Sequence, residues 1–209
     1  MIVLISFAPS IGCYVLIDHG VIGQHRLQFM IINRLVSTVI FTTLPLLYLR
    51  AGGIAGLDKI GVHFNQLNTL WTTSLPACLI ILAVLLLSHK FGILPAQIRA
   101  TRLPDGCAIW DVGSWILYVL AYEFIFRGFL LFISLELLPR QQAVLMNVFL
   151  YGILHFHKGI TEVMLSLPFG LILCMMTLHT GSIWCAFLIH STLAVTMNLL
   201  IHNQHAINN

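Results

Sequence analysis

The chain has 209 residues, of which 59% are hydrophobic and only 8% are charged, and its formal net charge is +3. Soluble domains carry about 25% charged residues, so a chain this poor in charge cannot cover a water-exposed surface of ordinary composition. The ten Lys and Arg residues are spread along the sequence without a basic cluster, which argues against nucleic acid as a partner. The composition favours an integral membrane protein with lipid as its main contact.

Apolar runs recur along the whole chain, and a spanning helix needs about 20 mainly apolar residues. The length leaves room for about seven such helices but not for a soluble domain as well. We predict an all-α fold, a polytopic transmembrane helix bundle that forms a single integral membrane domain over residues 1–209. The predicted helices cover about residues 2–17, 29–49, 70–87, 108–138, 142–157, 161–178 and, after a helix end at Thr180-Gly181, 182–201.

The first run lacks a basic region and is not followed by a small-residue cleavage site, so it indicates a first spanning or half-spanning helix and not a removed signal peptide. These features predict a multi-pass protein of a cell membrane, and the absence of a targeting segment fits a prokaryotic cytoplasmic membrane. Arg34, near the start of the second run, is expected to extend to the membrane interface. The loop between Lys90 and Pro104 is expected to lie partly on the membrane surface.

The most informative polar residues lie in the C-terminal half. The fourth run contains the sequence Tyr122-Glu123-Phe124-Ile125-Phe126-Arg127-Gly128. Glu123 and Arg127 are four residues apart and therefore share a helix face. Because one charged side chain at the centre of a membrane costs roughly 2.5–3.5 kcal/mol, we expect the two to neutralise each other inside the bundle. Such a pair marks either a functional site or a structural ion pair that fixes the helix register.

Two histidines lie inside later apolar runs. His155 is near the end of the fifth run, on the same face as Tyr151, and His190 is well inside the last run. A buried His needs a polar partner, and the sequence offers few of them. We therefore predict that Glu123, His155 and His190 form an intramembrane cluster on three different helices.

This cluster allows two routes to hydrolysis, most plausibly of a peptide bond. Glu123, His155 and His190 are a possible metal-binding set that holds Zn²⁺ and leaves one position open for water. Alternatively, in a metal-independent route, Glu and His activate water as general bases while another His donates to the oxyanion. Glu162, at the start of the sixth run, is either a reserve acid or a charge that stabilises the N-terminus of a helix.

These residues resemble the motifs of the CPBP intramembrane proteases, which include the type II CAAX prenyl endopeptidases and the Abi proteins of bacteriocin processing and self-immunity. The first motif of that family is usually two adjacent Glu, three residues and Arg. The second is Phe, three residues and His, and the third is a His on a later helix. Glu123 and Arg127 match the second Glu and the Arg, and His155 and His190 match the two histidines. The resemblance implies a catalytic core over residues 108–201 with these four residues as catalytic.

The sequence departs from the family pattern at three positions. Tyr122 stands in place of the first Glu, which in the family helps to activate water. Tyr151 stands in place of the Phe. Ala194 stands where an Asn or Asp commonly supplies an oxyanion donor, and Asn198, one turn further along, is a candidate replacement.

The leading hypothesis is an intramembrane endopeptidase, a hydrolase acting on a hydrophobic or lipidated peptide, either prenylated or a leader. Glu123 would activate water with His155, Arg127 would hold Glu123 ionised, and His190 would stabilise the oxyanion or join a metal site. The alternative is a non-catalytic membrane immunity or scaffold protein of the same fold, which the missing first Glu and the missing Asn or Asp after His190 favour. A small proton-coupled transporter ranks last because the sequence shows no inverted repeat.

Overall fold

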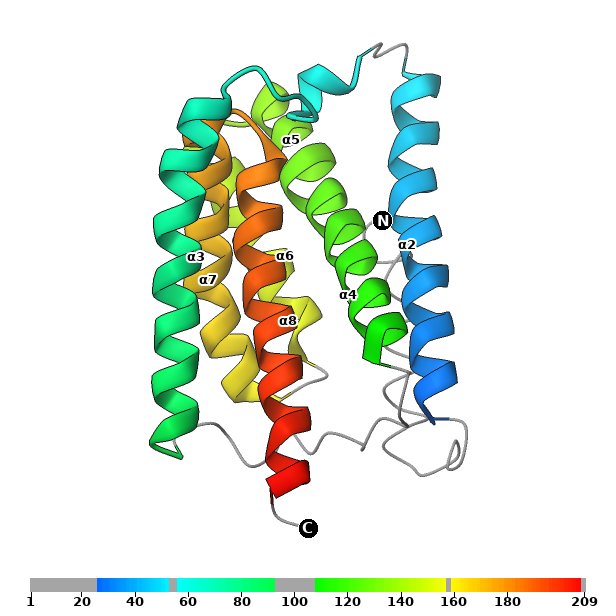
Figure 1. Ribbon diagram of the computed structural model, residues 1–209. Coiled ribbons are helices and arrows are strands. Elements are labelled where there is room, and N and C mark those ends of the chain that lie inside the picture. The colour runs from blue at the N-terminus through cyan, green and yellow to red at the C-terminus, as the bar shows by residue number, and fades with distance from the viewer. Residues whose placement is uncertain (1–25, 53–55, 93–107, 157–158, 208–209) are drawn as a thin grey trace.

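The computed structural model describes residues 26–52, 56–92, 108–156 and 159–207. Within this part of the chain every regular element is a helix, so the predicted all-α fold is confirmed there. Successive long helices run in alternating directions, which brings them side by side in one bundle (Figure 1).

The bundle is formed by nine helical elements among the described residues. They are α2 (Arg26–Ala51), η1 (Leu57–Ile60), α3 (Leu67–Lys90), α4 (Ala108–Glu123), η2 (Phe124–Leu130), α5 (Leu131–Leu137), α6 (Arg140–Leu154), α7 (Ile160–Thr180) and α8 (Ile183–Ile207). The η1 element is a short 3-10 helix, and η2 is a π-helix that joins α4 to α5 without a break.

Five stretches of the described chain are long and apolar enough to cross a membrane, which fits a multi-pass membrane protein. They are Gln28–Ala51, Leu67–Lys90, Ile109–Leu137, Ile160–Thr180 and Ile183–Leu200. The predicted count of about seven is not confirmed. The fifth run forms a helix, but α6 has only 15 residues, too few for a full span. The first predicted run, residues 2–17, lies outside the described residues, as do residues 93–107 of the predicted surface loop.

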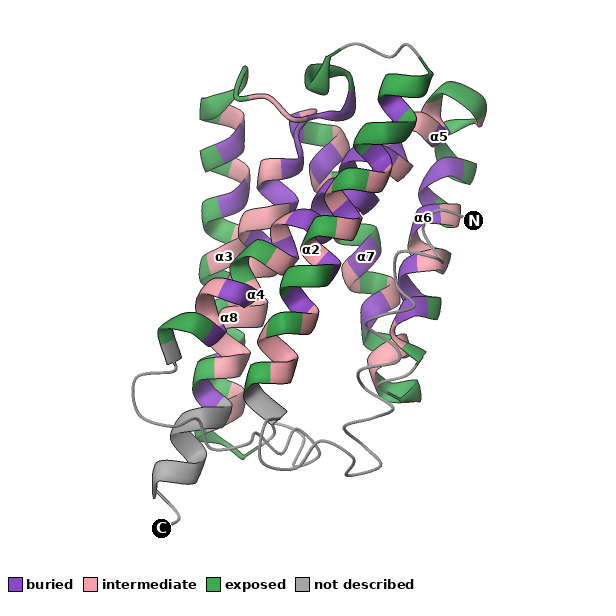
Figure 2. Ribbon diagram, turned by 90° about the vertical axis from the view of Figure 1, so that its right-hand side faces the viewer, coloured by how far each residue is buried: buried purple, intermediate pink, exposed green. Residues whose placement is uncertain are grey.

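The continuous helix α4–η2–α5 forms the centre of the bundle. In its most apolar window 61% of the residues are buried, against 17–28% in the other four spans. The outer helices instead expose large apolar side chains such as Leu47 and Ile80, and exposed residues line much of their outer surface (Figure 2). Lipid is a suitable solvent for such a surface.

The helix end predicted at Thr180-Gly181 is present, because Gly181 caps α7 with φ +65°, a conformation that favours glycine. The next helix, α8, continues to Ile207, beyond the end predicted at about Ile201. This turn returns the chain antiparallel to α7, so that α8 packs against α3, α4 and α7. His190 is thereby placed facing the central helix.

The prediction that Arg34 reaches the membrane interface is wrong. Arg34 is only 6% exposed, and its Nη1 donates to Asp111 Oδ1 at 2.6 Å and to Ser114 Oγ at 3.0 Å. Its guanidinium carbon lies 4.3 Å from the ring centroid of Trp115. From α8, Asn198 Nδ2 donates to the other carboxylate oxygen of Asp111 at 2.5 Å. We call Arg34, Asp111, Ser114 and Asn198 the α2–α4–α8 polar cluster.

Candidate active site

Glu123 is the last residue of α4 and lies midway along the span Ile109–Leu137. Its side chain has no exposed surface. A carboxylate at this depth needs compensating charge and hydrogen bonds. Two residues from different parts of the sequence, Arg127 and His190, supply them.

Arg127 approaches Glu123 from one helical turn further along, inside η2. Its Nε lies 3.3 Å from Glu123 Oε2 and its Nη1 lies 3.5 Å from Oε1. Its Nη2 donates to the carbonyl oxygen of Gly170 on α7 at 3.4 Å, and its guanidinium carbon lies 4.4 Å from the ring centroid of Tyr151 on α6. The fully buried cation is thus held by three elements, and the predicted shared face with Glu123 is present.

His190 makes the shortest contact to Glu123. Its Nδ1 lies 2.5 Å from Glu123 Oε1, and its side chain is 15% exposed while that of Glu123 is fully enclosed. Because the acceptor is a carboxylate oxygen, Nδ1–H is the donor, and Nε2 is the other ring nitrogen. A carboxylate bonded to one nitrogen of a partly exposed imidazole is the arrangement that general-base histidines use.

Aromatic rings enclose His190 on three sides. The ring centroids of Tyr122, Tyr151 and Phe169 lie 5.7, 6.4 and 5.6 Å from that of His190, all edge to face. Tyr122, which stands where the related family has its first Glu, is also packed against Phe126 at 4.8 Å. These rings lower the polarity around the Glu123–His190 pair, which strengthens the interaction between the two groups.

His155 lies at the C-terminus of α6 and is partly buried. Its Nδ1 donates to the carbonyl oxygen of Tyr151 at 2.8 Å, and its ring centroid is 4.6 Å from that of Tyr151. The same Tyr151 ring contacts His190, so the two histidines lie on one side of the bundle, joined through a tyrosine.

The proposed zinc ligands do not converge. Among the described residues no three His, Cys, Asp or Glu side chains are arranged to hold a metal ion. Glu123 Oε1 and His190 Nδ1 bond to each other, and His155 Nδ1 bonds to a backbone carbonyl. A metal held by these two histidines would be bound by Nε2 of each ring, since the other nitrogen of a metal-bound histidine ordinarily donates to a carboxylate or a carbonyl. Zinc binding stays an untested prediction.

Two other predicted residues have surroundings of their own. Glu162 is in the first turn of α7, half-buried, where a carboxylate suits the helix N-terminus. Asn198, the candidate oxyanion donor, is instead bonded to Asp111 in the α2–α4–α8 polar cluster. Asn198 therefore does not supply the oxyanion donor that is missing at position 194.

The sequence interpretation missed Asn147, which is fully buried and bonded to the backbone of η2. A signal was present, because Asn147, Tyr151 and His155 follow one another at four-residue spacing and so form one polar stripe on an apolar helix. The partner of Asn147 is a backbone carbonyl, which no sequence pattern marks.

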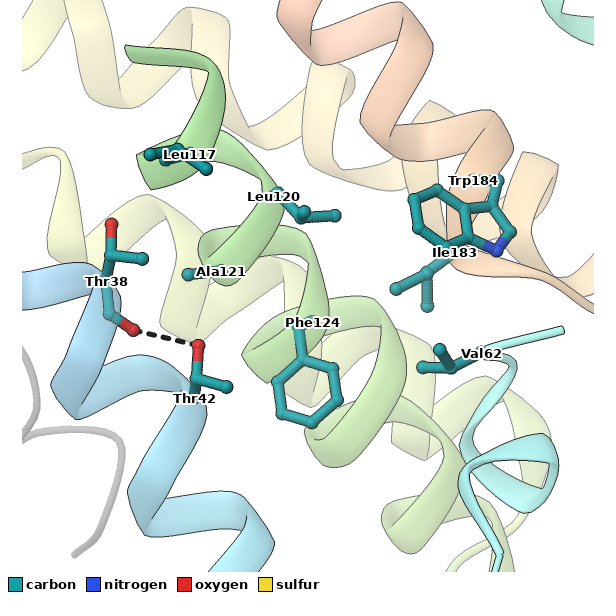
Figure 3. A pocket seen from close by; sticks show the side chains of 9 residues that line it. All are labelled: Thr38, Thr42, Val62, Leu117, Leu120, Ala121, Phe124, Ile183 and Trp184. Carbon is teal, nitrogen blue, oxygen red and sulfur yellow. Dashed lines mark hydrogen bonds between the residues drawn. The ribbon is translucent and has the colours of Figure 1, made fainter. Parts of the chain in front are cut away.

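An apolar cavity of about 200 Å³ lies beside the central helix, between α2, the segment after η1 and the start of α8 (Figure 3). Its lining residues are Thr38, Thr42, Val62, Leu117, Leu120, Ala121, Phe124, Ile183 and Trp184. Glu123 and the two histidines of the site do not line it. Phe124 directly follows Glu123, so the cavity and the charged cluster occupy neighbouring faces of the same helix.

Comparison with known proteins adds one finding to this geometry. Residues 105–196 match the family described as Type II CAAX prenyl endopeptidase Rce1-like. The match includes Glu123, Arg127, His155 and His190, and it confirms the family resemblance predicted from the motifs. No curated protein and no solved structure matches the chain.

Proposed function

Starting from the similarity of residues 105–196 to the type II CAAX prenyl endopeptidases, we propose that this chain is an intramembrane endopeptidase. It hydrolyses a peptide bond in a membrane-associated peptide, using water activated by a Glu–His pair. One observation carries the proposal: a fully buried Glu123, midway along the central span, lies 2.5 Å from the partly exposed His190.

The difference in exposure divides the work between these two residues. Water cannot contact Glu123 directly in this conformation because its side chain is enclosed, whereas His190 has 15% of its side chain open. His190 Nε2 therefore takes the proton from the attacking water, and Glu123 orients the ring and stabilises the imidazolium that forms. Arg127 keeps Glu123 ionised. This assignment differs from the sequence hypothesis, in which Glu123 acted with His155 and His190 served the oxyanion.

His155 has the complementary role in this proposal. Its Nδ1 donates to the Tyr151 carbonyl oxygen, and the nitrogen we assign to the substrate is the other one, Nε2. A protonated His155 donates from Nε2 to the oxyanion of the tetrahedral intermediate or to the departing amine. Tyr151 contacts both rings, and the proposed base and acid come from two different helices, α8 and the end of α6.

The substrate proposed is a hydrophobic or lipidated peptide in a cell membrane, prenylated or a leader sequence. The apolar cavity supports this choice, because Phe124 and the start of α8 border it and belong to the elements that carry Glu123 and His190. A prokaryotic cytoplasmic membrane is the location we propose.

A second candidate is a non-catalytic immunity or scaffold protein of the same fold. Tyr122 in place of the first Glu and Ala194 in place of an oxyanion donor favour it. In that case the Glu123–Arg127–His190 contacts serve only to hold the helices. Immunity or partner binding would then persist in a His190→Ala variant that still inserts.

The test compares protein N-termini across whole cells that express wild type, His190→Ala, His155→Ala or His179→Ala at equal membrane levels. His179 is exposed in the last turn of α7 and provides a matched histidine control. Endopeptidase activity predicts new N-termini with wild type and His179→Ala that are missing with both site variants. Identical N-termini in all four cells would overturn the proposal. The comparison is then repeated on wild-type membranes treated with a chelator. The zinc-dependent route predicts that cleavage is lost, and the metal-independent route predicts that it continues.

A further inference from the structure

The backbone changes its winding directly after Glu123. Residues Phe124–Leu130 form a π-helix, in which the Leu131 N–H donates to the Phe126 carbonyl oxygen, five residues back. Arg127, the partner of Glu123, lies within this wider turn. Single π-helical turns in longer helices are rare and are frequent at functional sites. The wider turn therefore needs a structural reason to persist in this helix.

Asn147 of α6 supplies a contact to this turn. Its side chain is fully buried, and its Nδ2 donates to the Phe126 carbonyl oxygen at 2.8 Å. Cys174 of α7 in turn donates its thiol to Asn147 Oδ1 at 3.2 Å. Because Oδ1 faces Cys174, the amide nitrogen is held toward the π-turn. The orientation of the amide is thus set by a third helix.

The same two helices, α6 and α7, also contact Arg127, one helical turn away from Asn147 and Cys174. Tyr151, four residues after Asn147, lies under the Arg127 guanidinium, and Gly170, four residues before Cys174, accepts its Nη2 hydrogen bond. A Cβ at position 170 would lie 3.0 Å from Tyr151 Cδ1 and 3.5 Å from Arg127 Nη2. The contacts around Asn147 and those around Arg127 are therefore tightly packed one turn apart on the same helices. The position of the π-turn carbonyl is thereby coupled to the position of the guanidinium.

From these contacts we infer that Asn147 is a positioning residue that fixes the π-helical turn and so sets the geometry of Arg127, Glu123 and His190. An α-helix advances by about 100° per residue, so loss of the wider turn would rotate everything after it relative to Glu123. The bond from Asn147 to Phe126 stabilises the π-turn in its present register. The inference concerns the site of the proposed function, but its geometric content does not depend on proteolysis.

The test uses the Nδ1–H proton of His190, whose short bond to Glu123 gives an NMR resonance far downfield that is identified by its loss in His190→Ala. Asn147→Leu keeps the approximate volume and removes the donor. We expect this variant to lose or shift the resonance. Val144→Ala, which shortens a buried apolar side chain one turn earlier on α6, is the control for lost packing and leaves the resonance in place.

A second pair of variants tests the inference if Asn147→Leu does not fold. Cys174→Ser keeps a donor to Asn147, whereas Cys174→Val removes it. We expect the His190 resonance to persist in Cys174→Ser and to shift in Cys174→Val. An unchanged resonance in Asn147→Leu, or in Cys174→Val where the first variant does not fold, overturns the inference, as does an equal shift in Val144→Ala.

The resonance also separates this inference from the proposed function. If the chain cleaves peptides, Asn147→Leu lowers kcat about 10- to 100-fold with KM nearly unchanged, since a displacement near 1 Å at the reacting groups costs that much. If no cleavage is found and the resonance still responds as expected, the positioning role holds while the endopeptidase proposal fails.

Discussion

The bundle holds two buried pairs of arginine and carboxylate, and they are built differently. Arg34 and Asp111 approach to 2.6 Å, and both oxygens of Asp111 have partners, from Arg34 and Asn198. Arg127 and Glu123 approach only to 3.3 Å, and the facing Nε and Oε2 atoms lack hydrogen-bond geometry to any partner among the described residues. The short bond of Glu123 goes instead to His190.

Under the proposed function, this difference separates a structural pair, Arg34 and Asp111, from a reactive pair, Arg127 and Glu123. A buried ion pair stabilises a fold only when its remaining donors and acceptors are satisfied, as in the α2–α4–α8 polar cluster. A catalytic carboxylate needs a neighbouring cation to stay ionised, but its strongest bond should go to the group that exchanges protons. Glu123 meets that description, with Arg127 at longer range and His190 close.

The largest effect is expected for His190→Ala. Removing the base of the proposed reaction should lower the rate of peptide cleavage on the order of 10³- to 10⁴-fold, measured with a peptide found by N-terminal profiling. The change also removes the shortest bond of the buried Glu123, which keeps only Arg127, so the free energy of unfolding in detergent should fall by about 1.5–3 kcal/mol. A variant that cleaves at the wild-type rate would remove His190 from the mechanism.

Asp111→Ala should show the opposite pattern. The change leaves the buried Arg34 without its carboxylate, which costs about 3–5 kcal/mol of unfolding free energy. Cleavage per folded molecule should stay near the wild-type value because the α2–α4–α8 polar cluster makes none of the contacts of Glu123 or His190. A cleavage loss larger than the folded fraction explains would show that the two pairs are coupled.

The pair of Glu123 and Arg127 could be predicted from the sequence because the two residues are close together in the chain. Glu123 and Arg127 lie four residues apart in one apolar run, which places both on one face whatever the rest of the fold does. The structural pair has no such signal. Arg34 and Asp111 are separated by 77 residues, so Arg34 alone read as a residue near a membrane interface.

Other features needed the tertiary structure for similar reasons. The π-turn at Phe124–Leu130 accepts a hydrogen bond from Asn147, which is 21 residues away from the carbonyl it contacts. Helix propensity, which depends on the local sequence, cannot predict that bond. The bond between Glu123 and His190 joins residues 67 positions apart. Sequence reasoning grouped these two residues by their shared polarity, but it could not tell which histidine would contact the carboxylate.

Gly170→Ala should affect the reactive pair by a smaller amount. The new Cβ would lie 3.0 Å from Tyr151 Cδ1, so the ring under Arg127 must move. We expect overpacking of about 1–3 kcal/mol and a reduction in cleavage of about tenfold.

Gly113→Ala is the matched control, because a Cβ at that helical position in α4 meets nothing within 4 Å. It should stabilise the helix by about 0.5–1 kcal/mol and leave cleavage unchanged. If Gly170→Ala behaved like Gly113→Ala in both assays, the tight packing around Arg127 would have no role in the site.

The smallest effect expected is that of Ser114→Ala in the structural pair. Ser114 Oγ accepts from Arg34 Nη1 at 3.0 Å and donates to the Asp111 carbonyl at 2.8 Å. Arg34 keeps its bond to the Asp111 carboxylate, so the loss should be about 1 kcal/mol of unfolding free energy, with cleavage unaffected.

Ser74→Ala on α3 tests whether the loss of unfolding free energy in Ser114→Ala comes from the bond between Ser114 and Arg34. Ser74 is equally buried but donates only to the Leu70 carbonyl of its own helix, a bond that adds little because the carbonyl is already paired. Ser114→Ala should therefore be the more destabilising of the two when both are unfolded in the same detergent. Equal values would mean that the extra bond to Arg34 adds nothing. In that case the closeness of Arg34 to Asp111, and not the number of bonds around them, would distinguish the structural pair from the reactive one.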